Sequence, residues 1–93
     1  MNDEPEIENP EIIMYSQALC GYCAAARKFL RRKGVAFTEI NVTMDATRRR
    51  EMVNRSGRSS VPQIFVGNRH IGGYDDMVEL DRRNELDTLL GTT

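Results

Sequence analysis

The 93-residue sequence predicts one α/β domain, a small sandwich with a four-stranded mixed sheet flanked by helices in the order β-α-β-α-β-β-α. Its first half runs strand, helix, strand, which favours a right-handed parallel unit. Its second half holds two strand patterns separated by Gly67-Asn68, which favours an antiparallel hairpin. With 40% hydrophobic and 29% charged residues, the composition is ordinary for a soluble globular domain.

The first elements follow an acidic start. Residues 1–10 contain two prolines and four acids, so we expect a disordered tail there and a domain over residues 11–93. Residues 11–15 form an apolar run of strand type. Residues 21–33 carry an apolar stripe at helical spacing with basic residues in the last turn, and Gly34 suits the end of that helix.

The middle of the chain predicts a strand and a helix. Residues 35–42 alternate β-branched and aromatic side chains, which indicates a second strand. Asp45 can cap a helix that runs to about Ser56, where Gly57 ends it.

The last third predicts the hairpin and a final helix. Residues 61–66 and 69–71 are its strands, and two glycines then break the pattern. Asp76-x-x-Glu79 resembles a capping box that opens a helix through about Arg83. Three leucines after it are expected to form an apolar turn that packs back on the domain.

Charge is distributed unevenly along the chain. The net charge is −1, but the first eleven residues hold five acids and no bases, leaving nine acids and thirteen bases in the rest. This excess favours a solvated basic surface or a surface for a small anionic ligand. Nucleic acid is not expected as a partner, because aromatic residues make up only 6% and no binding motif occurs. Without an apolar run of about 18 residues or a leader-like start, we expect a cytoplasmic protein with no membrane contact.

The two cysteines of the chain, Cys20 and Cys23, stand three positions apart at the entrance of the first predicted helix. The first turn of a helix has unpaired N–H groups and a partial positive charge. The sulfur of Cys20 can accept hydrogen bonds from the N–H groups of Tyr22 and Cys23, which lowers the thiol pKa from its usual value of about 8.5. Cys23 lies within disulfide reach and is more enclosed. Cys20 is therefore the expected attacking thiolate and Cys23 the resolving one.

Three other interpretations of the cysteine pair explain less. A structural disulfide that closes so short a loop would stabilise the fold little. A zinc site needs four ligands, and the chain offers a single histidine, His70, and no second CxxC, so no metal site is expected from these residues. Two cysteines that merely pack stay open as a minor alternative. In a reducing cytoplasm, redox or thiol-cluster chemistry is favoured.

Several collinear motifs support a family resemblance: Tyr15-Ser16, then CGYC at residues 20–23, SGRSSVPQIF at 56–65 and HIGGYDD at 70–76. With them, residues 11–90 resemble a glutaredoxin, particularly the short bacterial dithiol type. The resemblance implies a thioredoxin-like sandwich. It also implies a glutathione-dependent thiol–disulfide oxidoreductase that reduces glutathione mixed disulfides through Cys20, and protein disulfides through Cys20 together with Cys23.

The resemblance further implies a glutathione site. The Val61-Pro62 bond is expected to be cis, which would bring the backbone of Val61 beside the attacking sulfur to pair with the main chain of glutathione. Tyr74 and Asp75 are expected to bind its γ-glutamyl end. Arg58 is expected at the glycine carboxylate.

Neighbouring residues are given plainer roles. Tyr22 is expected to contact the ligand, and the alternative role for Tyr22 is partial cover of the site. For Asp75 the alternative role is helix capping, and for Arg58 it is that of an exposed charge at a helix end. Asp76 is interpreted mainly as a helix cap. His70 is interpreted as a solvated strand residue and Arg48-Arg49-Arg50 as a solvated helix face.

Two residues depart from the usual family pattern. Gln17 stands where most relatives have lysine, which removes a charge that would hold the glutathione carboxylate. Gln17 is still expected to bind glutathione, since its side chain can donate one hydrogen bond. Gly21 stands where proline is commoner, and relatives with a small residue there include some that bind a [2Fe–2S] cluster between two subunits. The alternative function is therefore a cluster-binding or carrier glutaredoxin, with Cys20 and glutathione as ligands in a dimer.

The expected partners follow from these functions. They are glutathione, glutathionylated or disulfide-bonded proteins and, indirectly, the glutathione reductase system. A monomer is expected, or a dimer only if a cluster bridges it. A third function, a dedicated electron donor to one reductase that ignores glutathione, is disfavoured by Arg58, Tyr74 and Asp75.

Overall fold

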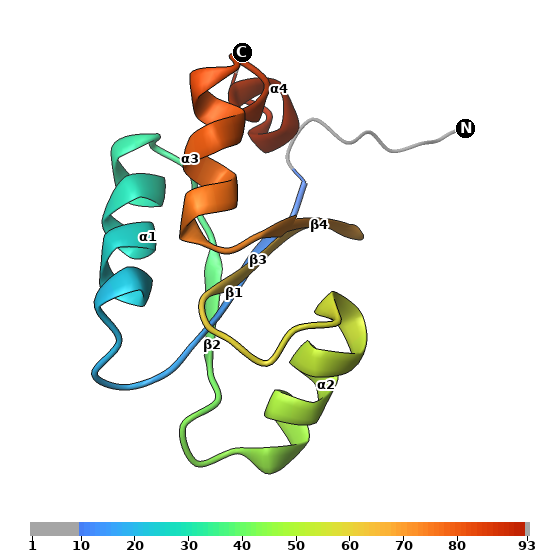
Figure 1. Ribbon diagram of the computed structural model, residues 1–93. Helices are drawn as coiled ribbons and strands as arrows, with labels where there is room; N and C mark the ends of the chain where they lie inside the picture. Colours follow the sequence, from blue (N-terminus) through green and yellow to red (C-terminus); the bar gives the residue numbers. More distant parts are fainter. Residues whose placement is uncertain (1–9, 93) are drawn as a thin grey trace.

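The computed structural model describes residues 10–92, and Figure 1 shows the path of the chain. The predicted tail lies, except for Pro10, outside the described residues. The predicted order of elements is confirmed, with the three C-terminal leucines in a short fourth helix. In chain order the elements are β1 (Ile12–Ser16), α1 (Gly21–Arg32), β2 (Thr38–Asn41), α2 (Ala46–Ser56), β3 (Gln63–Val66), β4 (Arg69–Gly72), α3 (Tyr74–Arg82) and α4 (Leu86–Leu90).

The four strands form one mixed sheet in the order β2-β1-β3-β4. β1 pairs parallel with β2, and it pairs antiparallel with β3, which forms the predicted hairpin with β4. β1 is therefore a central strand, and Met14, Tyr15 and Ser16 near its end are all fully buried. The chain leaves this buried strand directly into the loop that carries Cys20.

Helices cover both faces of the sheet (Figure 1). Because side chains alternate along a strand, neighbours in β1 and β3 belong to different cores. Met14 and Ile64 lie in the larger core with residues of α1, α3 and α4. Tyr15 and Phe65 lie in the smaller core with Met52 of α2.

A polar contact fastens α2 to the smaller core. The hydroxyl of Tyr15 donates to the carboxylate of Glu51 and accepts a 2.9 Å hydrogen bond from Arg55. Burial raises the pKa of Tyr15, and the hydrogen bond from Tyr15 lowers the pKa of Glu51. The guanidinium of Arg55 also lies 4.1 Å from the ring centroid of Phe65. α2 is therefore held at a fixed place beside β1 and β3.

Two predicted strand starts are wrong by a few residues. The second strand begins at Thr38 and not at residue 35, because pairing with β1 starts at the partners Ile13 and Thr38. The third strand likewise begins at Gln63 instead of residue 61.

No helix among the described residues has the length and apolar character needed to cross a membrane.

The third helix begins earlier than the sequence pattern indicates. α3 starts at Tyr74, and Gly73 occupies its N-cap position. Asp76 is the third residue of the helix, and its carboxylate accepts a 2.8 Å hydrogen bond from the N–H of Gly73. Its capping role is thus confirmed, but from within the first turn.

Candidate functional site

Cys20 is the N-cap residue of α1, and its sulfur occupies the place where a serine or aspartate oxygen usually caps a helix. The N–H of Cys23 donates to the Cys20 sulfur at 3.1 Å. The two sulfurs form a disulfide, with 5.2 Å between the Cα atoms. The first turn contains no acidic residue, so nothing there opposes negative charge on the sulfur. The hydrogen bond expected from Tyr22 is not among those of the described residues.

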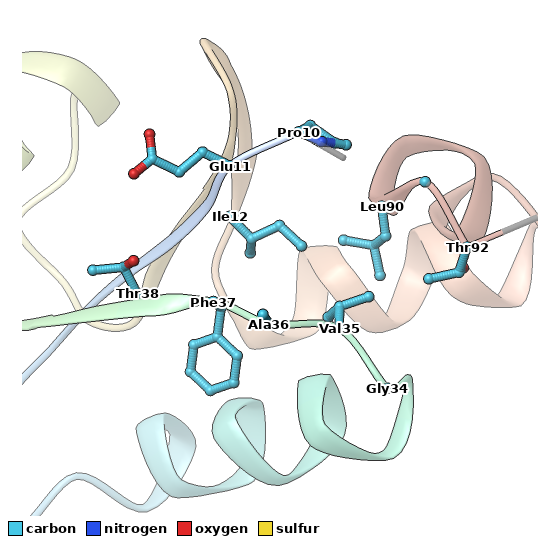
Figure 2. A pocket seen from close by; sticks show the side chains of 11 residues that line it. Pro10, Glu11, Ile12, Gly34, Val35, Ala36, Phe37, Thr38, Leu90 and Thr92 are labelled. Atoms are coloured by element: carbon cyan, nitrogen blue, oxygen red, sulfur yellow. The ribbon is translucent and has the colours of Figure 1, made fainter. Parts of the chain in front are cut away.

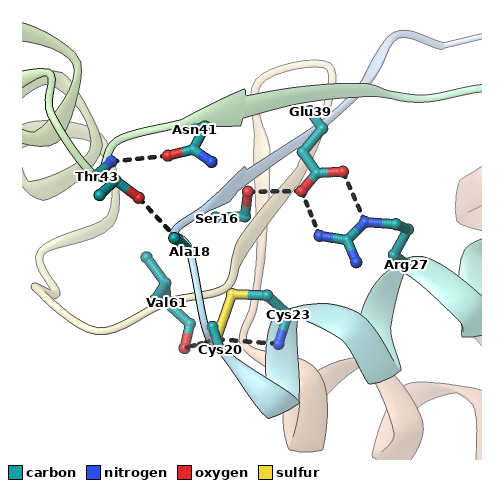
Figure 3. A network of polar contacts seen from close by, with 9 residues as sticks. All are labelled: Ser16, Ala18, Cys20, Cys23, Arg27, Glu39, Asn41, Thr43 and Val61. Atoms are coloured by element: carbon teal, nitrogen blue, oxygen red, sulfur yellow. Dashed lines mark hydrogen bonds and ion pairs between the residues drawn. A yellow bond between two sulfur atoms is a disulfide. The ribbon is translucent and has the colours of Figure 1, made fainter.

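The two sulfurs differ in access as predicted from their positions. Cys23 is fully buried at 0% exposure, whereas Cys20 is partly exposed. An incoming disulfide can therefore reach Cys20 first. The carbonyl oxygen of Val61 lies 4.0 Å from the Cys20 sulfur (Figure 3). The Val61-Pro62 bond is cis, as expected.

A surface depression gathers most of the predicted ligand-binding residues beside this sulfur. It is formed by the start of α1, the loop before β3 and the first turn of α3. The rings of Tyr22 and Tyr74 lie 6.1 Å apart within it. Its lining contains Tyr22, Arg58, Ser60, Val61, Pro62, Gly73, Tyr74, Asp75 and Asp76.

Asp76 and Arg58 form an ion pair at the edge of the depression. The Asp76 carboxylate accepts a 2.8 Å hydrogen bond from Arg58 in addition to the one from Gly73. These bonds, first the one from Arg58 and then the one from Gly73, lower the pKa of Asp76. Arg58 therefore lies with Tyr74 and Asp75, on the side where the γ-glutamyl end of glutathione was expected.

Gln17 lies in a different depression, which includes Cys20 but shares no residue with the first. The side-chain oxygen of Gln17 accepts a 2.8 Å hydrogen bond from Arg49 of α2. A guanidinium thus stands beside the position where most relatives carry lysine. Gln17 and Arg58 therefore lie in separate depressions.

Arg49 is a candidate site residue that the sequence pattern did not indicate. Arg48 and Arg50 are exposed, as expected of a solvated helix face, but Arg49 is half-buried. Helical spacing would have indicated that Arg49 faces the domain. Arg49 precedes the buried Met52 by three residues, and it therefore shares the face of α2 that meets the sheet.

A second network holds the loop between β1 and α1 (Figure 3). The buried Ser16 donates to Glu39 at 2.7 Å, and Arg27 of α1 binds both oxygens of that carboxylate at 2.9 and 2.6 Å. The hydrogen bonds from Arg27 are the main reason why the pKa of Glu39 is lowered. Farther along the loop, the N–H of Ala18 donates to Thr43 at 2.7 Å. These contacts fix the loop that delivers Cys20.

His70 is not the solvated strand residue that the sequence predicts. It is half-buried, its Nε2 lies 2.7 Å from the side-chain oxygen of Gln63, and its ring packs on Phe65 at 4.9 Å. Burial lowers the pKa of His70. Gln63 is buried too and donates to the carbonyl of Ser60 at 3.1 Å. The pair supports the loop that presents the Val61 backbone.

Another depression lies where the start of β1, the loop after α1 and the C-terminal turn meet (Figure 2). Apolar side chains such as Ile12, Val35 and Leu90 line it, and it contains none of the predicted site residues.

Within residues 10–92, no group of three or more histidine, cysteine or acidic side chains is arranged to hold a metal ion.

Comparisons with known proteins identify the family. The model of the glutaredoxin family, "Glutaredoxin", matches residues 12–71. Glutaredoxin 3 of Escherichia coli K12 is 48% identical over 77 residues, covering 83% of this chain and 93% of the relative. The glutaredoxin of Pseudomonas aeruginosa PAO1 is 42% identical over 81 residues, covering 87% and 96%.

Solved structures agree with these relatives. The solution structure of a Brucella melitensis glutaredoxin has a TM-score of 0.81 at 42% identity and covers 95% of this chain and 96% of that one. A buckwheat glutaredoxin–glutathione complex has a TM-score of 0.79 at 26% identity and covers 87% and 76%. With its paired Cys20 and Cys23 at the start of a helix, the chain belongs to the glutaredoxin family of thiol–disulfide oxidoreductases, within the thioredoxin superfamily.

Proposed function

We propose that the protein reduces glutathione mixed disulfides through Cys20, and protein disulfides through Cys20 and Cys23, with glutathione as co-substrate. The observation that carries the proposal is the position of the Cys20 sulfur. The sulfur accepts a hydrogen bond from the N–H of Cys23 at the N-terminus of α1. It lies between two depressions, one lined by Gln17 and the other by Tyr74 and Asp75. Such surroundings stabilise a thiolate and leave it open to attack a disulfide.

The first half-reaction is a thiol–disulfide exchange. The Cys20 thiolate attacks the glutathionyl sulfur of a mixed disulfide, a bond forms between these two sulfurs, and the old S–S bond breaks. The target cysteine leaves with the electron pair and takes a proton from water. A glutathione thiolate then attacks the glutathionyl sulfur, which yields glutathione disulfide and restores the Cys20 thiolate.

Protein disulfides require both cysteines. Cys20 attacks one sulfur of the target and forms an intermolecular disulfide while the other target sulfur leaves as a thiolate. Cys23 then loses its proton and attacks the sulfur of Cys20, which releases the reduced target and leaves the Cys20–Cys23 disulfide present in this structure. Two glutathione molecules return that disulfide to the dithiol in the same manner.

The placement of charged groups suggests how glutathione lies on the surface. The N-terminus of α3 suits the γ-glutamyl carboxylate, and Asp75 suits the ammonium group. The Val61 backbone can pair with the cysteinyl unit. We place the glycine carboxylate at Gln17 and Arg49, because Arg58, the expected partner, is bound by Asp76 on the γ-glutamyl side.

Coupled turnover assays test this function. Glutathionylated 2-mercaptoethanol should be reduced in the presence of glutathione and glutathione reductase, and not with thioredoxin reductase in its place. Cys20→Ser should lose all activity. Cys23→Ser should keep reduction of the mixed disulfide and lose reduction of a protein disulfide. An inactive Cys23→Ser beside an active Cys20→Ser would reverse the assigned roles, and turnover with thioredoxin reductase alone would overturn the dependence on glutathione.

The cluster-carrying alternative stays a prediction. Cys20 is the accessible sulfur and is the residue that would ligate a bridging [2Fe–2S] cluster. Gly21, which motivated the alternative, is surrounded by open space, and a Cβ added to it would meet no atom within 4 Å, so the fold does not require glycine there. An iron assay and an absorption spectrum of protein purified without oxygen, with glutathione present, decide it, and a colourless iron-free monomer would exclude the cluster.

A further inference from the structure

A buried amide lies beside the loop that presents the Val61 backbone. Among residues 10–92, the fully buried polar side chains are Ser16 and Gln63. Ser16 belongs to the network that fixes the loop of Cys20. Gln63 is 1% exposed and begins β3, a strand that is otherwise apolar and is buried along its whole length. Burying an amide costs free energy unless its hydrogen bonds are satisfied, so the contacts of Gln63 indicate what it holds in place.

The hydrogen bonds of this amide have fixed directions. The nitrogen of Gln63 donates to the carbonyl oxygen of Ser60 at 3.1 Å and to its hydroxyl at 3.3 Å. A carbonyl oxygen can only accept, so the amide oxygen of Gln63 must face His70, whose Nε2 lies 2.7 Å away. The amide oxygen can also only accept, so Nε2 of His70 carries the proton. The line of donors therefore runs from His70 through Gln63 to the backbone of the loop.

The ring of His70 is itself held in place by the fold. It packs on Phe65 with 4.9 Å between the ring centroids, and these two residues are partners in the pairing of β3 with β4. Gln63 and Phe65 are two residues apart in β3 and therefore point to the same face of the sheet. Phe65 belongs to the smaller core, against which Val61 also packs. A rigid part of the molecule thus supports the donor of His70.

The exposed part of the loop has weaker support. Residues 57–60 are exposed and belong to no strand. The side chain of Arg58 reaches α3 through its ion pair with Asp76, at 2.8 Å. Both side chains of this pair are largely exposed, and such ion pairs hold a segment only weakly. The buried hydrogen bonds of Gln63 are therefore the stronger attachment of the loop.

The position of this loop decides the shape of the depression proposed for glutathione. Val61 and Pro62 lie on one side of it, and the first turn of α3 lies on another. The two sides are close, because an ideal Cβ on Gly73 would stand 3.5 Å from the carbonyl oxygen of Pro62. A glutathione molecule that pairs with Val61 and reaches α3 must match this spacing, so a shift of the loop alters both contacts at once.

We propose that Gln63 and His70 are positioning residues for glutathione. Through Ser60 they set the place of the Val61 backbone relative to the N-terminus of α3, so that the cysteinyl and γ-glutamyl units of one molecule are bound together. The inference rests on the proposed function and adds two residues to it. Neither residue lines the depressions beside Cys20, so both act through the loop and not by touching the substrate.

Steady-state kinetics with glutathionylated 2-mercaptoethanol test the proposal. Gln63→Leu fills similar space and removes the hydrogen bonds to the loop and to His70. His70→Phe keeps a ring on Phe65 and removes the donor. Each variant should raise the KM about three- to tenfold, as expected when a hydrogen bond to the substrate backbone is lost, and should leave kcat within about twofold of the wild type.

Three controls separate positioning from damage to the fold or to the sulfur. His70→Gln offers an amide donor in place of Nε2 and should return the KM to within about twofold of the wild type. Val66→Ala, three residues farther along β3, removes buried methyl groups from the larger core, so it should lower stability in urea unfolding and leave the KM unchanged. The iodoacetamide alkylation rate of Cys20 in the Cys23→Ser background should be the same with and without His70→Phe.

The outcomes separate this proposal from the function on which it rests. An unchanged KM in Gln63→Leu or in His70→Phe would overturn positioning by the pair. An equal rise of the KM in Val66→Ala would trace the effect to lost stability, and a His70→Gln variant as impaired as His70→Phe would show that the donor is not needed; either result would overturn it. Slower alkylation of Cys20 would assign the pair to the sulfur and overturn it too. If Gln63→Leu does not fold, the comparison of His70→Phe with His70→Gln decides alone. Failure of the wild type on every glutathione mixed disulfide would instead overturn the proposed function.

Discussion

Gly72 joins β4 to α3, and replacing it with alanine tests how the first turn of α3 is positioned. Its φ angle is +117°, a conformation that residues with a Cβ rarely adopt. A Cβ at this position would stand 2.7 Å from Cγ and 2.8 Å from Cβ of Asp76 and would also collide with Oδ2. The substitution should therefore displace the carboxylate that binds the N–H of Gly73 and the guanidinium of Arg58.

The expected cost has two parts. Backbone strain contributes about 1–3 kcal/mol. Displacing the Asp76 carboxylate removes a cap worth about 1 kcal/mol and an exposed ion pair worth about 0.2–1 kcal/mol. Gly72→Ala should therefore destabilise the fold by about 2–5 kcal/mol, and Asp76→Ala by about 1–2 kcal/mol. The double variant should fall short of the sum by about 1–2 kcal/mol, the full effect of Asp76→Ala, because the same carboxylate contacts are lost only once.

Urea unfolding followed by circular dichroism measures these free energies. Gly67→Ala is the matched control, because Gly67 also has positive φ, +60°, but has open space around its Cβ position. It should cost less than Gly72→Ala. The reasoning is refuted if Gly72→Ala costs no more than Gly67→Ala, or if the effects of Gly72→Ala and Asp76→Ala are fully additive.

Three further predictions concern the supports of the site. Arg49→Ala should raise the KM for a glutathione mixed disulfide about five- to tenfold, because it removes the cation beside Gln17. Arg50→Ala, at an exposed position, should leave this KM unchanged, and equal KM values for the two variants would contradict the placement of the glycine carboxylate. Gln63→Leu should lower the free energy of unfolding by about 1–3 kcal/mol, since it removes the hydrogen bonds that the buried amide makes with Ser60 and His70. A change below about 0.5 kcal/mol in urea unfolding would contradict this. Because burial lowers the pKa of His70 in the folded state, its contribution to stability should be complete above the unfolded pKa of about 6.5 and decline as the pH falls below it. Unfolding curves at several pH values check this, and a His70→Gln variant with an unchanged pH slope would refute it.

Much of the fold could be predicted because local signals agreed with the tertiary arrangement. Asp45 caps α2 through the N–H of Arg48 as expected, and Gly57 ends that helix in a left-handed conformation. The second strand was overestimated because Val35 and Phe37 are apolar for another reason. They pack against the larger core without pairing with a neighbouring strand.

The site could be predicted only where a residue acts through its place in a motif. Cys20 and Cys23 follow from their position at a helix entrance, since the first turn itself supplies the N–H group. Arg49 and His70 could not be assigned in this way. Their roles depend on Gln17 and Gln63, which lie 32 and 7 residues away along the chain and meet them only in the folded protein.

The central claim is that Cys20 is a thiolate at neutral pH because the first turn of α1 stabilises its charge. The most direct test is the rate of iodoacetamide alkylation as a function of pH. The Cys23→Ser variant is used, since it leaves Cys20 as the chain's one thiol and keeps the backbone N–H that bonds it. The account predicts a half-maximal rate at least about one pH unit below the value of about 8.5 for an ordinary cysteine. A curve that coincides with that of free cysteine would contradict it.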